Sequence, residues 1–307
     1  MSSAQRSRVS GLDALGAPPG KRSSRRVLFA LATACALAAA LALGRGAFAP
    51  PSTENAFEGR PEPTEQLFTS AAGRSIFAAA TGLDSGPLIV FVHGTPGAWN
   101  DFAFVMATPE LAARARLVAV DRIGWGHSAE GGIEASLAEQ ARAVASVIEA
   151  QPETRTVVLV GHSLGAPIAA RLAADRADLI DALVLVAGAL DPALEEPTWY
   201  QALGRTAWIT PLVPEVRRRA DLELLSLRAE LEALAPALGE LTLPVRVLHG
   251  LDDALVPVEN ADYLARSLRR APFEIERIPD QGHLIPWQCP ERIVAVLLAL
   301  LSESDSR

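Results

Sequence analysis

The most constraining feature of this chain is the stretch TVVLVGHSLGAPIAARLAA at residues 156–174. Its first residues are apolar and mostly β-branched, without polar alternation, which predicts a short buried strand. From Pro167 on, the composition is helical. Only the segment from Gly161 to Gly165 lies between the two, so the turn is sharp, and glycines on both sides of Ser163 remove Cβ atoms that would collide there. The sequence therefore predicts a strand–turn–helix unit with a serine hydroxyl at its apex.

Short apolar runs and helical stretches alternate along the rest of the chain. The predicted strands are residues 87–94, 116–123, 156–163, 182–189 and 245–250, and the predicted helices are 134–150, 167–177 and 259–271. Such alternation predicts an α/β fold with a mostly parallel sheet and helices on both faces. In a sheet of this kind the reactive groups gather at the carboxyl ends of the strands.

Two of those strand ends carry partners for a serine nucleophile. A serine hydroxyl needs a base to take its proton and an acid to orient that base. The strand VRVLHG is followed by Asp252 and Asp253, and His283 follows the predicted strand in FEIERIPDQGH. Both aspartates are candidates on this reasoning, and His283 is the candidate base.

The segment FVHGTPG, residues 91–97, is a further strand end and opens into a loop. Acyl transfer needs backbone N–H groups aimed at the developing oxyanion. We expect these donors to be the N–H groups of Thr95 and Leu164, although a plain turn after a core strand is the alternative. The segment DRIGWGHS, residues 121–128, is expected to be structural. The same holds for the other four histidines, His93, His127, His162 and His249.

The motifs HGTPG, DRIGWGHS, GHSLG and the pair GLDDALVP with QGH follow one another in this order. With them the chain resembles the α/β-hydrolase superfamily over residues 66–302. The resemblance implies that Ser163 is the nucleophile and His283 the base. In the superfamily's G-x-x-D-x-x-x-P pattern the acid is the third residue after the glycine, which implies Asp253 here. Asp252 is then expected to face solvent or to cap the loop.

The resemblance also implies an activity. Serine at the nucleophile position disfavours haloalkane and epoxide chemistry, and Thr95 and Pro96 replace the glycine run of hormone-sensitive-lipase relatives. We expect a serine hydrolase that cleaves carboxylic ester or similar acyl bonds through an acyl-enzyme, with no metal and no cofactor. Two alternatives stay open: an acyltransferase that uses the same triad, and a non-catalytic binding protein on the hydrolase scaffold.

Residues 191–242 stand where the superfamily inserts a helical cap, and a small helical cap is expected there. Its aromatic residues are candidates for an apolar pocket that takes a small, uncharged ester or acyl group. These candidates are Trp199, Tyr200 and Trp208, together with Trp99. Packing of the cap onto the core explains the aromatic residues of the cap equally well.

The N-terminal part predicts a membrane segment. Residues 1–26 are basic and form an expected cytoplasmic tail, and residues 27–43 are 17 uncharged residues suited to a transmembrane anchor or an export signal. Positive charge on the N-terminal side places the catalytic domain on the non-cytoplasmic side of the membrane. Export after signal cleavage is the alternative. Residues 44–65 are predicted to be a linker.

The charge of the chain narrows the possible partners. A net charge of −8 and the lack of a basic stripe argue against a nucleic-acid partner. Only Cys289 of the two cysteines lies in the predicted globular domain, so a cysteine-based metal site is excluded there. The sequence carries no signal for an oligomeric state.

Overall fold

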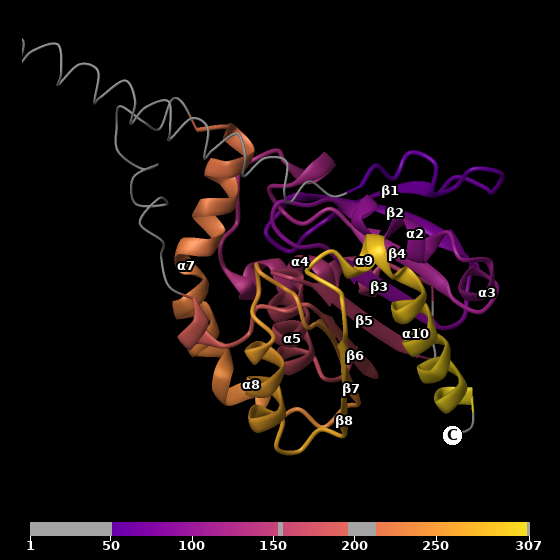
Figure 1. Cartoon of the computed structure of the whole chain (residues 1–307). Helices are drawn as coiled ribbons and strands as arrows, with labels where there is room; N and C mark the ends of the chain where they lie inside the picture. Colours follow the sequence, from indigo (N-terminus) through magenta and orange to yellow (C-terminus); the bar gives the residue numbers. More distant parts are fainter. Residues whose placement is uncertain (1–50, 153–155, 196–212, 306–307) are drawn as a thin grey trace, which may run out of the picture. The chain divides into compact units, whose positions relative to one another are not determined.

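The computed structural model describes residues 51–152, 156–195 and 213–305. They build an eight-stranded sheet in the order β1-β2-β4-β3-β5-β6-β7-β8 (Figure 1). The strands are β1 (Thr64–Thr69), β2 (Ser75–Gly82), β3 (Leu88–Val92), β4 (Arg116–Val120), β5 (Val157–His162), β6 (Ala182–Val186), β7 (Val245–Gly250) and β8 (Phe273–Ile278). β1 pairs with β2 and β2 with β4 in antiparallel fashion. All other pairs are parallel, as the alternation predicts.

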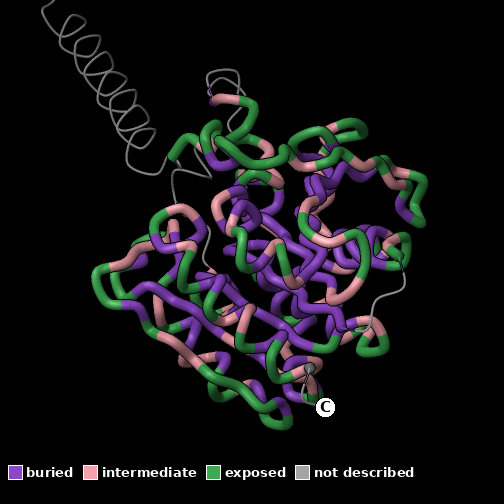
Figure 2. The backbone as a smooth tube through the Cα atoms, turned by 90° about the vertical axis from the view of Figure 1, so that its right-hand side faces the viewer, coloured by how far each residue is buried: buried purple, intermediate pink, exposed green. Residues whose placement is uncertain are grey.

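The central strands are buried on both faces, which explains their continuous apolar sequence. Every residue of β3, β4, β5 and β6 is buried, and Figure 2 shows this buried interior. In β3 the side chains alternate between two hydrophobic clusters. Val90 belongs to one cluster, and its neighbours Ile89 and Phe91 belong to the other. A single strand thus contributes to the cores on both faces of the sheet.

Helices cover both faces. The helices are α2 (Ala103–Met106), α3 (Pro109–Ala112), α4 (Leu137–Glu149), α5 (Gly165–Asp175), α7 (Glu215–Leu238), α8 (Glu259–Ser267), α9 (Ile285–Gln288) and α10 (Pro290–Asp305), with short 3₁₀ turns η1 (Trp99–Phe102), η2 (Gly126–Ser128) and η3 (Pro192–Leu194). Buried residues of α4, α5, α7 and α8 belong to one cluster, and those of α2, α3, α9 and α10 to the other. Helix α4 begins at a side-chain cap, where Ser136 accepts a hydrogen bond from the N–H of Glu139.

The folded part begins earlier than the sequence predicts. Strand β1 starts at Thr64, inside the range 44–65 that its composition marks as a linker. Phe57 of the same range is only 5% exposed and packs with the cluster that includes α2 and α10. A single aromatic side chain in a polar stretch gives no periodicity, so the composition hides this anchoring contact.

The expected cap lies between β6 and β7. Its described part consists of η3 and the long helix α7, which packs against α5 (Figure 1). The buried side chains Leu227, Leu231, Leu234 and Leu238 recur every three or four residues and form the apolar stripe of α7. The helical character expected for this segment is therefore present over residues 215–238.

Across residues 51–152, 156–195 and 213–305, no helix is both long enough and apolar enough to cross a bilayer. The predicted membrane segment at 27–43 lies outside the described residues. The same is true of Trp199, Tyr200 and Trp208, three of the four residues expected to line the substrate pocket.

Candidate active site

Ser163 lies at the sharp turn between β5 and α5. Its φ of 53° is a left-handed value that costs a non-glycine residue about 1–3 kcal/mol. Backbone hydrogen bonds hold this conformation: the N–H of Ser163 donates to the carbonyl of Val186 at 3.0 Å, and the N–H of Ala166 donates to the carbonyl of Ser163 at 3.0 Å. The surrounding sheet and helix therefore stabilise a strained serine at the carboxyl end of a central strand.

The two glycines around Ser163 are required by close packing. A Cβ atom at Gly161 would overlap the backbone of Gly165, and one at Gly165 would overlap the carbonyl oxygen of Val92. Helix α5 thus starts directly against the end of β3, as the glycine spacing predicts. Leu164 is the residue that precedes this helix, so its N–H lies at a helix N-terminus, where negative charge is favoured.

Asp253 and His283 come together at the ends of the neighbouring strands β7 and β8. The Nδ1 of His283 lies 2.8 Å from Oδ2 of Asp253. The other oxygen, Oδ1, accepts hydrogen bonds from the N–H groups of Leu255 at 2.9 Å and Val256 at 2.8 Å. The Asp253 side chain is completely buried, whereas Asp252 is exposed. Of the two candidate acids, Asp253 is therefore the one in contact with the imidazole.

The surroundings of Asp253 keep its carboxylate ionised. Burial by itself raises the pKa of Asp253, but the hydrogen bond from His283 and those from the two backbone N–H groups outweigh it and hold the pKa below its ordinary value. A second imidazole, that of His249, lies 3.6 Å from Oδ2 of Asp253. Its Nε2 donates instead to the carbonyl of Val256 at 2.9 Å, and burial lowers its pKa. His249 is therefore a neutral neighbour of the Asp253–His283 pair.

His162 links the serine turn to His283. Its ring centroid lies 4.9 Å from that of His283 and 5.6 Å from that of Trp287. The Nε2 of His162 lies 3.0 Å from the carbonyl oxygen of His283 and donates to it. Burial first, and His283 second, lower the pKa of His162 to about 3. A neutral histidine next to Ser163 thus holds the backbone of the candidate base.

The loop after β3 lies against the serine. A Cβ atom at Gly94 would stand 2.8 Å from Cβ and 3.3 Å from Oγ of Ser163. Glycine at this position therefore lets the loop backbone approach the side chain of Ser163. Thr95 is the next residue, so its N–H lies in the loop that borders Ser163, the loop in which the sequence predicts an oxyanion donor. The Thr95–Pro96 peptide bond is cis.

Two residues that sequence reasoning left out support this loop. Arg122 donates to the carbonyl oxygens of His93 at 2.9 Å and Gly94 at 2.8 Å. It also forms a buried ion pair with Glu223 of α7, at 2.7 Å. Glu223 stands four residues before Leu227 on the apolar stripe of the helix, and an acid in such a stripe is a sequence signal for a buried charge pair.

The neighbouring Asp121 organises the segment 121–128. Its side chain is completely buried and accepts hydrogen bonds from the N–H groups of Trp99 and His127, each at 2.7 Å. The structural role expected for this segment agrees with these contacts. The Trp99 side chain, assigned to the substrate pocket from sequence, is partly buried and packs against the cluster that includes Phe102.

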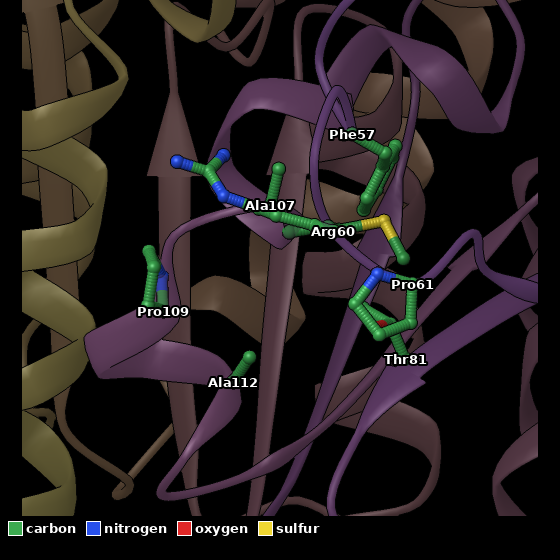
Figure 3. Close-up of a pocket in the computed structure, with 8 residues that line it drawn as sticks. Phe57, Arg60, Pro61, Thr81, Ala107, Pro109 and Ala112 are labelled. Carbon is green, nitrogen blue, oxygen red and sulfur yellow. The ribbon is translucent and has the colours of Figure 1, made fainter.

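A pocket of about 140 Å³ lies away from these residues (Figure 3). Phe57 and Pro61 line it on one side, and Met106 and Ala112 line it on the side of α2 and α3. None of the residues that line it belongs to the predicted site. The candidate active site is the region of the serine turn instead, because His162, His283 and Asp253 contact one another there. Within the described ranges, no cluster of three or more histidine, cysteine, aspartate or glutamate side chains is arranged to hold a metal ion.

Comparison with known proteins identifies relatives of this chain. Residues 89–296 match the model of the Alpha/beta hydrolase family. The pimeloyl-[acyl-carrier protein] methyl ester esterase of Methylococcus capsulatus is 30% identical over 65% of this chain and 88% of its own length. The dihydrolipoyllysine-residue acetyltransferase component of the acetoin cleaving system of Pseudomonas putida is 26% identical over 75% of this chain and 67% of its own.

A solved structure shares the fold. The esterase RhEst1 from Rhodococcus sp. ECU1013 superimposes with a TM-score of 0.56 at 22% identity, covering 78% of this chain and 98% of the other. The family model spans well over half of the chain. The strand order of the sheet in this chain and its strained serine turn agree with that match. This chain belongs to the α/β hydrolase family.

Proposed function

We propose that this protein is a serine hydrolase that cleaves carboxylic ester or similar acyl bonds through an acyl-enzyme. The observation that carries the proposal is the hydrogen bond of 2.8 Å between Asp253 and His283. The ring of His283 lies 4.9 Å from that of His162, the residue that directly precedes Ser163 with its φ of 53°. An ionised acid that orients an imidazole next to a strained serine is the arrangement needed to activate a hydroxyl.

In the proposed mechanism, Ser163 Oγ attacks the carbonyl carbon of the substrate while the Nε2 of His283 takes the hydroxyl proton. Asp253 fixes the tautomer of His283 and stabilises the imidazolium that forms. The N–H groups of Thr95 and Leu164 stabilise the negative oxygen of the tetrahedral intermediate. The imidazolium then protonates the departing alcohol, and the acyl group remains on Ser163. Water then attacks the acyl carbon while His283 takes a proton from it. The bond to Ser163 Oγ breaks, the imidazolium returns the proton to Oγ, and the carboxylic acid is released.

The substrate class follows from the apolar character expected of the cap. A small, uncharged ester or acyl group suits a site bordered by apolar and aromatic residues. The name of the Methylococcus capsulatus relative, a methyl ester esterase, supports cleavage of a simple ester. Rates measured on a panel of esters with graded acyl length would identify the preferred substrate.

Acyl transfer is the second candidate, because one relative is named an acetyltransferase component. The same triad forms the acyl-enzyme, and an alcohol or amine replaces water in the second half of the reaction. Product analysis with an added alcohol separates the two activities. A dominant ester product would establish transfer, and a dominant free acid would establish hydrolysis.

Labelling with a fluorophosphonate tests the proposal. This probe phosphonylates an activated serine, so the wild-type protein is expected to be labelled and Ser163→Ala is not. Ser146→Ala, which changes a serine on helix α4, is the matched control and keeps full labelling. Absence of labelling in the folded wild-type protein would refute catalysis and leave a binding protein on the hydrolase scaffold.

We also propose that residues 27–43 anchor the protein in a membrane with the catalytic domain on the non-cytoplasmic side. The proposal rests on the uncharged run and on the basic residues before it. Carbonate extraction of membranes and protease protection of intact cells test it. Release of the full-length chain by carbonate would refute the anchor, and a shortened, released chain would indicate signal cleavage.

A further inference from the structure

The carbonyl oxygen of Gly94 is held by two donors. The Nη2 of Arg122 lies 2.8 Å from it, and the Nδ1 of His93 lies 2.7 Å from it. The Nε2 of His93 accepts the backbone N–H of Arg122 at 3.0 Å, so the proton of this neutral imidazole is on Nδ1. Both groups therefore donate to the same oxygen and fix its direction.

Fixing that oxygen fixes the N–H of Thr95. The peptide bond between Gly94 and Thr95 is trans, since the cis bond of this loop is the next one. In a planar trans peptide the C=O and the following N–H point in opposite directions. The N–H of Thr95 consequently points away from Arg122 and His93. This is the group that the proposed function uses as an oxyanion donor, and the inference rests on that proposal.

The guanidinium of Arg122 is in turn oriented by the cap. Glu223 of α7 accepts from Nη1 at 2.7 Å and from Nη2 at 3.1 Å, while Nε donates to the carbonyl of His93 at 2.9 Å. The side chain of Arg122 has no exposure and that of Glu223 has 2%. A planar group with this many fixed partners has one orientation available. Glu223 is thus the counter-charge that keeps Arg122 aimed at the loop.

We propose that Glu223, on the cap helix α7, is a positioning residue that holds the oxyanion-binding N–H of Thr95 in its working direction through Arg122. It touches neither Ser163 nor His283 in any contact described above. Its effect passes through the chain Glu223, Arg122, Gly94 carbonyl and Thr95 N–H. Under this proposal the cap helps to stabilise the transition state, because one of its residues orients an oxyanion donor.

The experiment compares the full-length wild-type protein with Glu223→Gln, which removes the charge and keeps the shape. Glu232→Gln is the matched control, because Glu232 is an exposed acid of the same helix paired with Arg228 at 3.2 Å. Rates on p-nitrophenyl acetate are normalised to sites titrated with the fluorophosphonate. The dissociation constant of phenylboronic acid is measured as well, since its serine adduct carries the negative charge of the intermediate.

Complete loss of one oxyanion donor lowers kcat by about 10²–10³-fold, so a misdirected donor is expected to lower it about 10–100-fold. For Glu223→Gln we expect this loss in kcat, a similar loss in boronate affinity and a KM within about threefold of wild type. Glu223→Asp keeps the charge and is expected to recover part of the loss. Arg122→Lys combined with Glu223→Gln should lose no more than Arg122→Lys alone, because both changes act on one contact.

Hydrogen exchange gives a readout that does not depend on catalysis. Amides of residues 91–99 are expected to exchange faster in Glu223→Gln than in Glu232→Gln. Wild-type kcat and boronate affinity in Glu223→Gln would overturn the inference, and so would independent, multiplying losses in the double variant. If the wild-type protein is not labelled by the fluorophosphonate, the proposed function fails. The role of Glu223 is then tested by hydrogen exchange alone, and an exchange rate in residues 91–99 that is equal in Glu223→Gln and Glu232→Gln would overturn it. Where Glu223→Gln does not fold, Glu223→Asp is measured in its place.

Discussion

The buried His162 is expected to make the stability of this protein sensitive to acid. Its Nε2 donates to the carbonyl of His283, and its ring packs against His283 and Trp287. The Nδ1 atom has no hydrogen-bond partner among the described residues. Protonation of His162 would place a charge in this enclosed site without an acceptor for the added N–H. We predict that replacing His162 with glutamine, which keeps an N–H donor and cannot titrate, removes the part of the acid sensitivity that comes from His162.

The size of the effect follows from the pKa shift. Burial lowers the pKa of His162 from 6.5 to about 3. Between these values the unfolded chain binds a proton that the folded chain does not, so the stability is complete above pH 6.5 and is lost as the pH falls towards 3. One pH unit in this window is worth about 1.4 kcal/mol. Lowering the pH from 7.5 to 5 therefore removes about 2 kcal/mol of unfolding free energy through His162 alone.

Urea unfolding of the wild-type protein and His162→Gln at pH 7.5 and pH 5 measures this contribution. Burial also lowers the pKa of His93 well below its ordinary value, but His93 is present in both proteins and cancels in the comparison. The wild-type protein is expected to lose about 2 kcal/mol more than the variant. Equal losses in the two proteins would show that His162 takes up its proton in the folded state and would refute the reasoning.

Asp253→Asn is expected to lower kcat by about 10⁴-fold, because the tautomer of His283 is disturbed. Asp252→Asn changes an exposed residue and is expected to change kcat by less than about threefold. If ester hydrolysis assays gave the reverse order, Asp252 would be the acid. Phe57→Ala is expected to lower the free energy of unfolding by about 3–5 kcal/mol because a buried ring is lost, and a change below about 1 kcal/mol in urea unfolding would contradict its anchoring role. Burial raises the pKa of Asp101 to about 8, so the folded state holds a proton that the unfolded state releases, and stability falls as the pH rises towards 8. Between pH 6 and pH 9 the wild-type protein should lose about 3 kcal/mol that Asp101→Asn does not lose; parallel thermal unfolding profiles for the two would disprove this.

Local sequence predicts the centre of the sheet well. Strands such as β3 and β5 are continuous apolar runs, because both of their faces are buried. Strands β1 and β2 could not be predicted in this way. They lie at the antiparallel edge, where β1 is mostly exposed, and β2 contains Ala78, Ala79 and Ala80, residues with weak strand preference.

The meeting of an aspartate with His283 could also be predicted, because Asp252, Asp253 and His283 follow the ends of two adjacent parallel strands. The strand ends alone left both aspartates open, and only the resemblance to the superfamily pattern pointed to Asp253. The pair Arg122 and Glu223 could not be predicted in the same way. The two residues are 101 positions apart in the sequence, and no motif connects them. Only the contact of α7 with the segment that follows β4 decides that their charges meet inside the protein.

The ion pair between Arg122 and Glu223 has a consequence for engineering. Caps are attractive parts to exchange between hydrolases, because each is inserted between two strands of a shared sheet. A transplanted cap without a carboxylate at this place would leave the guanidinium buried with no counter-charge, a change that costs about 3–5 kcal/mol. A chimera of this protein therefore needs a donor cap that brings its own acid to Arg122, or an apolar replacement for Arg122 made at the same time.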